Sequence, residues 1–172
     1  MYPIPNHLKH VFIINKNQSN KHSLEGNIKC FCGSNNIKLN IFACDYKSHL
    51  TVKEYKNNFG FRINAECNDC NKKFDIIDMS KHGYNGFICN NGIRVEENDL
   101  NKYICHKCKN DIFNIELGIE TADKEEFIED IVSEYDEFEP EDYVDAFDWI
   151  CISITCTNCN EKIEDWVSFE TA

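Results

Sequence analysis

Eight of the eleven cysteines in this 172-residue chain stand in close pairs, a spacing typical of metal-binding turns. Two thiolates in such a turn can converge on one ion, and two turns together supply the four sulfurs of a tetrahedral zinc site. Four cysteine ligands leave no open position for a reactive water, which favours a structural site over a catalytic one. The pairs are Cys30/Cys32, Cys67/Cys70, Cys105/Cys108 and Cys156/Cys159.

An internal repeat predicts how these pairs combine. Residues 61–74 and 150–163 each predict a strand, a turn that holds a cysteine pair, and a second strand. Residues 32–41 and 108–117, which follow the first and third pairs, also correspond. Each half of the chain should therefore open and close one site. The predicted ligand sets are Cys30, Cys32, Cys67 and Cys70 for one site, and Cys105, Cys108, Cys156 and Cys159 for the other.

The knuckles and their flanking strands resemble the zinc-ribbon families, in which two knuckles on β-hairpins hold one zinc ion. Together with the repeat, the resemblance implies a mainly β fold with minor α, made of two tandem zinc-ribbon-like antiparallel units related by internal duplication. It implies two structural zinc ions per chain, and iron in a rubredoxin-like four-cysteine site is the competing metal. The first knuckle, Cys30-Phe31-Cys32-Gly33, departs from the two-residue spacer that is usual in these families.

Three cysteines lie outside the pairs: Cys44, Cys89 and Cys151. The apolar strand contexts of Cys44 and Cys151 predict small buried thiols. A third metal site that recruits these cysteines with a histidine is the alternative. His106 is a spacer between two predicted ligands, and we expect its ring to point away from the ion.

One further segment, Asp75–Tyr84, collects two carboxylates, a lysine, a histidine and a tyrosine in ten residues. Polar residues beside glycines are typical of connecting loops, so we expect a structural role in which His82 anchors the connection by hydrogen bonds. The chain contains no glycine-rich nucleotide-binding motif, phosphate-binding loop, nucleophile elbow or zinc-protease motif. An enzyme therefore has no positive support, and no catalytic residue is predicted.

The elements that position the cysteines divide the chain into four expected parts. These are an N-terminal extension (1–27), a first unit (28–80), a connection (81–101) and a second unit (102–172) with an acidic insertion (120–148). In the first unit, a strand at 50–55 and a hairpin turn at Asn57–Gly60 should precede the second knuckle, and a strand at 74–77 should follow it.

Most of the negative charge lies in the insertion. The chain has a net charge of −12, and residues 120–148 hold 14 of its 30 acidic residues with one lysine. Apolar residues at helical spacing predict one helix there, capped by Asp123 with Glu126 at the capping-box position, and ended by Pro140. We expect its apolar stripe to pack on the sheet. The stripe comprises Phe127, Ile128, Ile131, Val132, Tyr135 and Phe138.

These features favour a zinc-stabilised, non-catalytic binding module that binds a basic protein partner through an acidic surface. An inhibitor, or an immunity-type protein against a basic toxin, would have such a composition. A nucleic-acid-associated zinc-ribbon protein in transcription or RNA processing is the alternative, although the chain has only two arginines and no dense basic run. A metalloenzyme is the second alternative.

The N-terminal residues predict no export or membrane insertion. Residues 1–20 contain only one short apolar run, which is neither a signal-peptide core nor a membrane span. Many cysteines without an export signal suit a reducing compartment, where close pairs bind metal instead of forming disulfides. We therefore expect a cytoplasmic protein that does not bind membranes.

Overall fold

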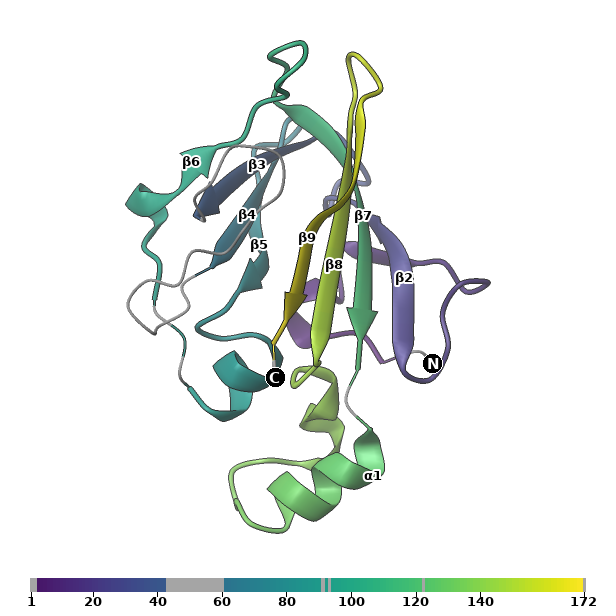
Figure 1. Ribbon diagram of the computed structural model, residues 1–172, viewed down its shortest axis with the longest axis vertical. Helices are drawn as coiled ribbons and strands as arrows, with labels where there is room; N and C mark the ends of the chain where they lie inside the picture. The colour runs from purple at the N-terminus through teal and green to yellow at the C-terminus, as the bar shows by residue number, and fades with distance from the viewer. Residues whose placement is uncertain (1–2, 43–60, 91, 93, 122, 172) are drawn as a thin grey trace.

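Strands in which apolar and polar residues alternate build most of the molecule. The computed structural model describes residues 3–42, 61–90, 92, 94–121 and 123–171 (Figure 1). In the strand Trp149–Cys156, for example, Ile150, Ile152 and Ile154 are buried and the residues between them are half-buried. This period of two places one face of each strand on a common core. The fold is mainly β with minor α, as predicted.

Within the described residues, nine strands join in one curled antiparallel sheet. Its hydrogen-bonded path runs β1-β2-β7-β3-β4-β5, β6 pairs with β3, and β8 lies between β7 and β9. The strands are β1 (Phe12–Ile14), β2 (Ser23–Ile28), β3 (Ile37–Phe42), β4 (Arg62–Cys67), β5 (Lys73–Asp78), β6 (Asn101–Lys102), β7 (Ile112–Glu120), β8 (Trp149–Cys156) and β9 (Lys162–Glu170).

Two three-stranded groups, β3–β4–β5 and β7–β8–β9, have the same arrangement and the same register. Ile37 of β3 pairs with Cys67, and Phe113 of β7 pairs with Cys156. Ile37 and Phe113 stand five residues after Cys32 and Cys108, so they are corresponding positions. β5 confirms the strand that we expected at 74–77. The hairpin at Asn57–Gly60, the strand at 50–55 and Cys44 lie outside the described residues.

Each of the two groups pairs with a strand from the other half of the chain, in corresponding registers. Ile37 and Phe113 pair with each other where β3 meets β7. β2, which precedes the first knuckle, pairs with β7 through Gly26 and Leu117. β6, which precedes the third knuckle, pairs in the corresponding register with β3, through Asn101 and Ile41. Each group is therefore completed by a strand from the other half of the chain, and the division into units stays a prediction.

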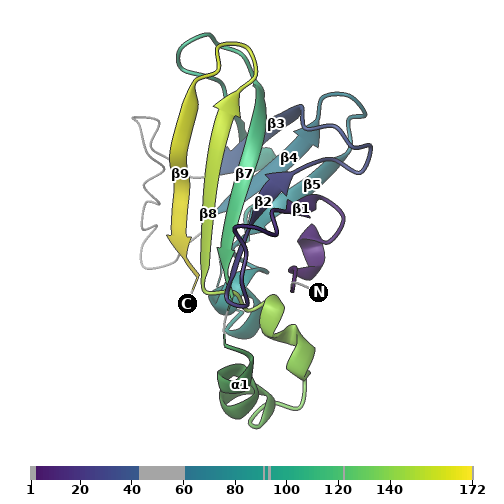
Figure 2. The same cartoon turned by 90° about the vertical axis from the view of Figure 1, so that its right-hand side faces the viewer.

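The main apolar core fills the curl of the sheet. Figure 2 shows β7, β8 and β9 turned at an angle to β3, β4 and β5, so that both groups contribute to one interior. Its largest fully buried side chains include Phe61, Phe113 and Phe147. The inward-facing cysteines Cys30, Cys67, Cys105 and Cys156 belong to this same core.

The acidic insertion forms a helical lobe (123–144) at the end of the sheet, at the bottom of Figure 1. α1 (Lys124–Phe127) continues directly into the π-helical segment η4 (Ile128–Val132). Asp123 caps the start, because its carboxylate accepts hydrogen bonds from the backbone N–H groups of Glu125 and Glu126. This confirms the predicted N-cap.

The predicted end of the helix at Pro140 was wrong. The helix ends at Val132, and Pro140 instead begins a separate 3₁₀ segment, η5 (Pro140–Val144). The residues after Val132 are rich in Asp and Glu, and negative charge is unfavourable near the negative end of a helix dipole. Proline at the first helical position is favourable because its missing N–H would have no partner there.

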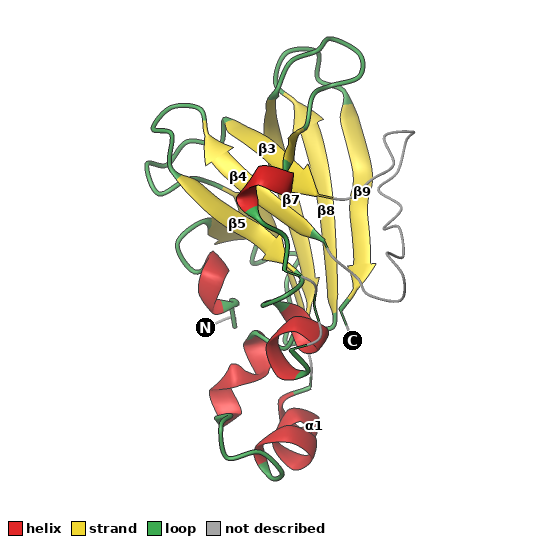
Figure 3. Cartoon of the chain, turned by 90° about the vertical axis from the view of Figure 1, so that its left-hand side faces the viewer, coloured by secondary structure: helices red, strands yellow, loops and turns green. Residues whose placement is uncertain are grey.

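The expectation that the apolar stripe packs on the sheet was also wrong. Phe127 and Ile131 are buried with Ala146 in a small second core beside the main one. Partly buried residues pack against this core both from the lobe itself and from η2 (Tyr84–Ile88), the π-helical turn after β5. Figure 3 shows these helical segments gathered beneath the sheet. Within the described ranges, no helix is long and apolar enough to cross a membrane.

Candidate metal centres

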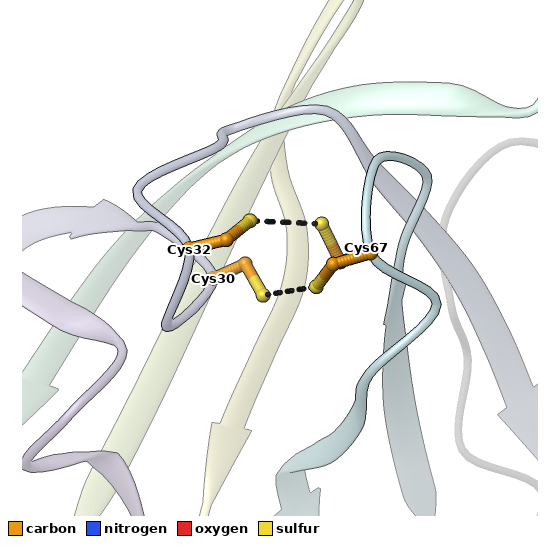
Figure 4. A group of neighbouring side chains, drawn as sticks. Cys30, Cys32 and Cys67 are labelled. Carbon is orange, nitrogen blue, oxygen red and sulfur yellow. Dashed lines mark hydrogen bonds between the residues drawn. The ribbon is translucent and has the colours of Figure 1, made fainter.

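The first cysteine tetrad joins the loop before β3 to the turn between β4 and β5. The sulfur of Cys30 lies 3.4 Å from that of Cys70, and the sulfur of Cys32 lies 3.6 Å from that of Cys67. Figure 4 shows Cys30 and Cys32 on one loop, facing Cys67 on the opposite turn. All four sulfurs lie within 4.8 Å of one another.

The second tetrad repeats this arrangement on β7, β8 and β9. The sulfur of Cys105 lies 3.7 Å from that of Cys159, and the sulfur of Cys108 lies 3.5 Å from that of Cys156. These four sulfurs also lie within 4.8 Å of one another. The structure thus gathers the eight cysteines in the two groups predicted from the repeat.

Both tetrads fit a tetrahedral metal ion. Four sulfurs bound at about 2.3 Å from one zinc ion lie about 3.8 Å apart, close to the separations seen in each group. A disulfide would require about 2.05 Å between two sulfurs, and all eight cysteines are free thiols. Each group can therefore hold one metal ion, in a pattern like that of zinc ribbons.

The backbone of each knuckle closes in the same way. The residue directly after the second cysteine has a positive φ, and these residues are Gly33, Asn71, Lys109 and Asn160. Three knuckles have two residues between their cysteines. In each of them, the carbonyl of the first cysteine accepts a hydrogen bond from the N–H four residues later, and its N–H donates to the carbonyl five residues later. In the first knuckle, Cys30 makes these bonds with Gly33 and Ser34, each one residue earlier. Its short spacer is thus accommodated by a turn that is one residue shorter.

Hydrogen bonds lower the pKa of one cysteine in each tetrad and so favour its thiolate form. Burial acts to raise the pKa of Cys156, but the backbone N–H groups of Cys159 and Asn158 and the side chain of Asn110 lower it to about 6. Burial also acts to raise the pKa of Cys67. Hydrogen bonds from backbone N–H groups and from neighbouring sulfurs outweigh it and lower this pKa to about 7. Burial and the adjacent sulfurs raise the pKa of Cys30 to about 12. Further thiolates in each group therefore need a cation to balance their charge.

Polar side chains tie the facing knuckles together. Ser34 donates a hydrogen bond of 2.5 Å to Asp69 across the first tetrad. Lys107 forms an ion pair with Glu161 across the second, with 2.7 Å between Nζ and Oε2. Asn110 donates from Nδ2 to the Cys156 sulfur at 3.5 Å and to the Ile112 carbonyl at 2.8 Å. The sequence analysis missed these supporting residues, since only their place beside the knuckles hints at the role.

Two described cysteines, Cys89 and Cys151, lie outside the tetrads. Cys151 is half-buried and donates its thiol hydrogen bond to Asp165 at 2.9 Å, whereas we expected a small buried apolar side chain. Burial, then the bond to Asp165, raises its pKa to about 12, so the thiol stays protonated. Cys89 is exposed, as is the spacer His106. Among the described residues, no third group of potential ligands gathers.

Residues of the polar segment Asp75–Tyr84 form ion pairs and pack within the fold. Asp75 accepts a two-pronged ion pair from Arg62, with Nε–Oδ1 at 2.9 Å and Nη2–Oδ2 at 3.2 Å. Asp78 is buried beside Lys81, whose Nζ lies 2.8 Å from its Oδ2. Tyr84 packs in the small second core.

A hollow of about 260 Å³ opens where the helical lobe meets the sheet. Its apolar lining combines Phe127 and Ile131 of the lobe with Tyr84 of η2. Its acidic lining consists of Asp123, Glu126, Asp130 and Asp148. Among the residues that the structure describes, no lysine or arginine forms an ion pair with these carboxylates; the one lysine of the lobe, Lys124, contacts Glu141 instead.

Two carboxylates of the hollow lie in opposite electrostatic surroundings. The backbone N–H groups of Glu125 and Glu126 lower the pKa of Asp123. Burial, followed by repulsion from Glu126 and other nearby carboxylates, raises the pKa of Asp148. The acidic surface predicted for residues 120–148, which includes Asp148, lies here, but its contact with Tyr84 of the polar segment was not foreseen from the sequence.

Comparisons with known proteins give no match from which a function could be inferred, so the metal centres and the hollow are the basis for that inference. No protein-family model matches the chain, and neither the curated proteins nor the solved structures include a significant match.

Proposed function

We propose that this chain is a zinc-stabilised, non-catalytic binding protein of the cytoplasm, whose helical lobe binds a basic protein. The observation that carries the proposal is the hollow, where four carboxylates surround an apolar lining and form no ion pair with a lysine or arginine of the described residues. A lysine or arginine side chain of a partner could neutralise these charges while its aliphatic part packs on Phe127 and Tyr84. An inhibitor or immunity-type role is one form of this function.

Zinc is the proposed metal at both tetrads. Sets of four thiolates suit zinc or iron, and a structural role without redox chemistry favours zinc. Elemental analysis of the purified chain should find two zinc ions per molecule. Iron in place of zinc, or one ion per chain, would contradict this part of the proposal.

Two charge-matched variants test the binding surface. Glu126→Gln with Asp130→Asn removes two charges from the hollow, and Glu134→Gln with Glu137→Gln removes two from the exposed lobe surface. With the zinc-loaded chain as bait, we expect the wild type and the second variant to capture the same basic protein. The first variant should lose it. Equal capture by both variants would contradict the proposal.

Nucleic-acid binding is the second candidate, and one observation favours it. Phe31 at the tip of the first knuckle is half exposed, and its ring lies 5.4 Å from the Lys72 ammonium. The ring centroids of His10 and Phe74 lie 6.3 and 5.9 Å from the centroid of the Phe31 ring. Exposed aromatic rings beside cations can stack on bases. A gel-shift titration with single-stranded DNA and RNA at low salt tests this candidate, which predicts retardation that Phe31→Ala weakens.

A further inference from the structure

Two half-buried histidines, 75 residues apart in the sequence, stack face to face. The rings of His7 and His82 have centroids 3.6 Å apart and an interplanar angle of 7°. His7 lies on the 3₁₀ turn η1 (Asn6–Leu8), and His82 lies in the loop after β5. The pair therefore joins the N-terminal segment to the end of the sheet that adjoins the helical lobe.

Hydrogen bonds assign a neutral form to His82. Its Nδ1 accepts from the backbone N–H of Asp78 at 3.0 Å, so this nitrogen carries no proton. The Nε2 of His7 lies 3.1 Å from the Ile76 carbonyl, which can only accept, so Nε2 of His7 carries its proton. A proton on Nδ1 of His82 would break its bond to Asp78.

The charged groups around the pair have opposing effects. Burial lowers the pKa of His7, while Asp145 at the end of η5 and Asp75 of β5 oppose that shift. Burial, followed by the neighbouring His7 ring, lowers the pKa of His82 to about 3. Asp78 of β5 opposes this shift, and Lys81 of the same loop and Arg62 of β4 add to it.

The same contact region anchors the helical lobe. Asn6 donates hydrogen bonds from its backbone and its side chain to the carboxylate of Asp145. The His7 ring also lies 6.4 Å from the ring of Phe147. Backbone bonds from Gly83 to Asp145 and from Tyr84 to Phe147 continue the junction. Separation of the two histidines would therefore loosen the N-terminal segment and the base of the lobe together.

We propose that the stacked pair of His7 and His82 is an acid-released latch that holds the N-terminal segment against the base of the helical lobe. Two protonated rings are unfavourable in this half-buried stack, because each loses part of its hydration and repels the other. The latch is closed at neutral pH, and protonation favours the open form increasingly as the pH falls below about 6.5, the value for a free histidine. For each histidine that is neutral in the closed form and protonated in the open form, the open-to-closed ratio rises by up to about tenfold for each unit by which the pH falls.

The test is an NMR titration of the zinc-loaded chain from pH 7.5 to 5. We expect the amides of Asn6–Leu8 and His82–Tyr84 to shift together, while the amides of Cys67–Cys70 and Cys156–Cys159 stay unchanged. His7→Gln with His82→Gln should remove the transition. His10→Gln with His22→Gln takes two histidines from exposed positions and should leave the transition as in the wild type.

Several outcomes would overturn the latch. One is a transition at the same pH in the variant without His7 and His82. Another is protonation of either ring without any movement of the nearby amides, and a third is simultaneous movement of the knuckle amides. If the double variant does not fold, His7→Gln alone keeps the test decisive, because a single remaining ring should open at lower pH. The latch does not depend on the proposed partner.

Discussion

Substitution of Cys30 by serine tests the first metal centre where it departs from the usual knuckle spacing. Cys30 is 3% exposed, and its short turn still places its sulfur 3.4 Å from that of Cys70. Serine keeps the size of the side chain but removes a thiolate ligand. We therefore expect Cys30→Ser to reduce the bound metal from two ions to one per chain.

The loss of stability follows from the loop that the tetrad closes. Cys32 and Cys67 are 35 residues apart, and the chain-entropy relation for a cross-link gives about 4 kcal/mol for a loop of that length. Desolvation of the unpaired serine hydroxyl adds about 1–3 kcal/mol. Together these effects are a large part of the 5–15 kcal/mol that stabilises a typical domain.

Urea unfolding followed by circular dichroism, with elemental analysis of the same samples, measures both quantities. Cys89→Ser is the matched control, because Cys89 is exposed and lies outside both tetrads. It should keep two ions and change the unfolding free energy by less than about 0.5 kcal/mol. If Cys30→Ser keeps two ions and loses less than about 1 kcal/mol, the assignment of Cys30 as a ligand is refuted.

Three further predictions concern the metal shell, the core and the outer face of the sheet. Asn110→Ala should weaken metal binding at the second tetrad by about 10–100-fold without changing the ion count, because it removes the hydrogen bond to Cys156; competition with a chelator measures this. Phe147→Ala should lower the unfolding free energy by about 3–5 kcal/mol in urea, since the ring is fully buried. Burial, then repulsion from neighbouring carboxylates, raises the pKa of Glu25, so its stabilising contribution is complete at low pH and is lost as the pH rises. Glu25→Gln should therefore raise the unfolding free energy at pH 7 by about 0.5 kcal/mol, discounted because the group is largely exposed, and the gain should shrink toward pH 4.5.

The cysteine groups could be predicted from the sequence because their determinants are local. A pair such as Cys67 and Cys70 fixes its own turn, and the repeated strand context identifies which pairs correspond. The N-cap at Asp123 was predictable for the same reason, since it depends only on the next three residues. Occupancy of the two groups by metal stays a prediction.

Long-range features could not be predicted in this way. The alternating residues of β2 indicate a strand, but they do not say which strand it pairs with, and its partner β7 lies in the other half of the chain. The apolar stripe around Phe127 has the spacing of a helix, yet its neighbours on η2 come from the connection. The stacked rings of His7 and His82 carry no sequence signal beyond the two histidines themselves.

The exchange of strands between the two halves sets an order for folding during synthesis. Cys30, Cys32, Cys67 and Cys70 leave the ribosome early and can gather before the second half exists. β2 cannot pair with β7 until residues 112–120 have emerged, so one strand edge stays open through much of translation. An open edge is a template for pairing with another chain. If the first tetrad binds its metal early, the ion would hold the first half in place during that interval, and metal supply would then affect the yield of folded protein.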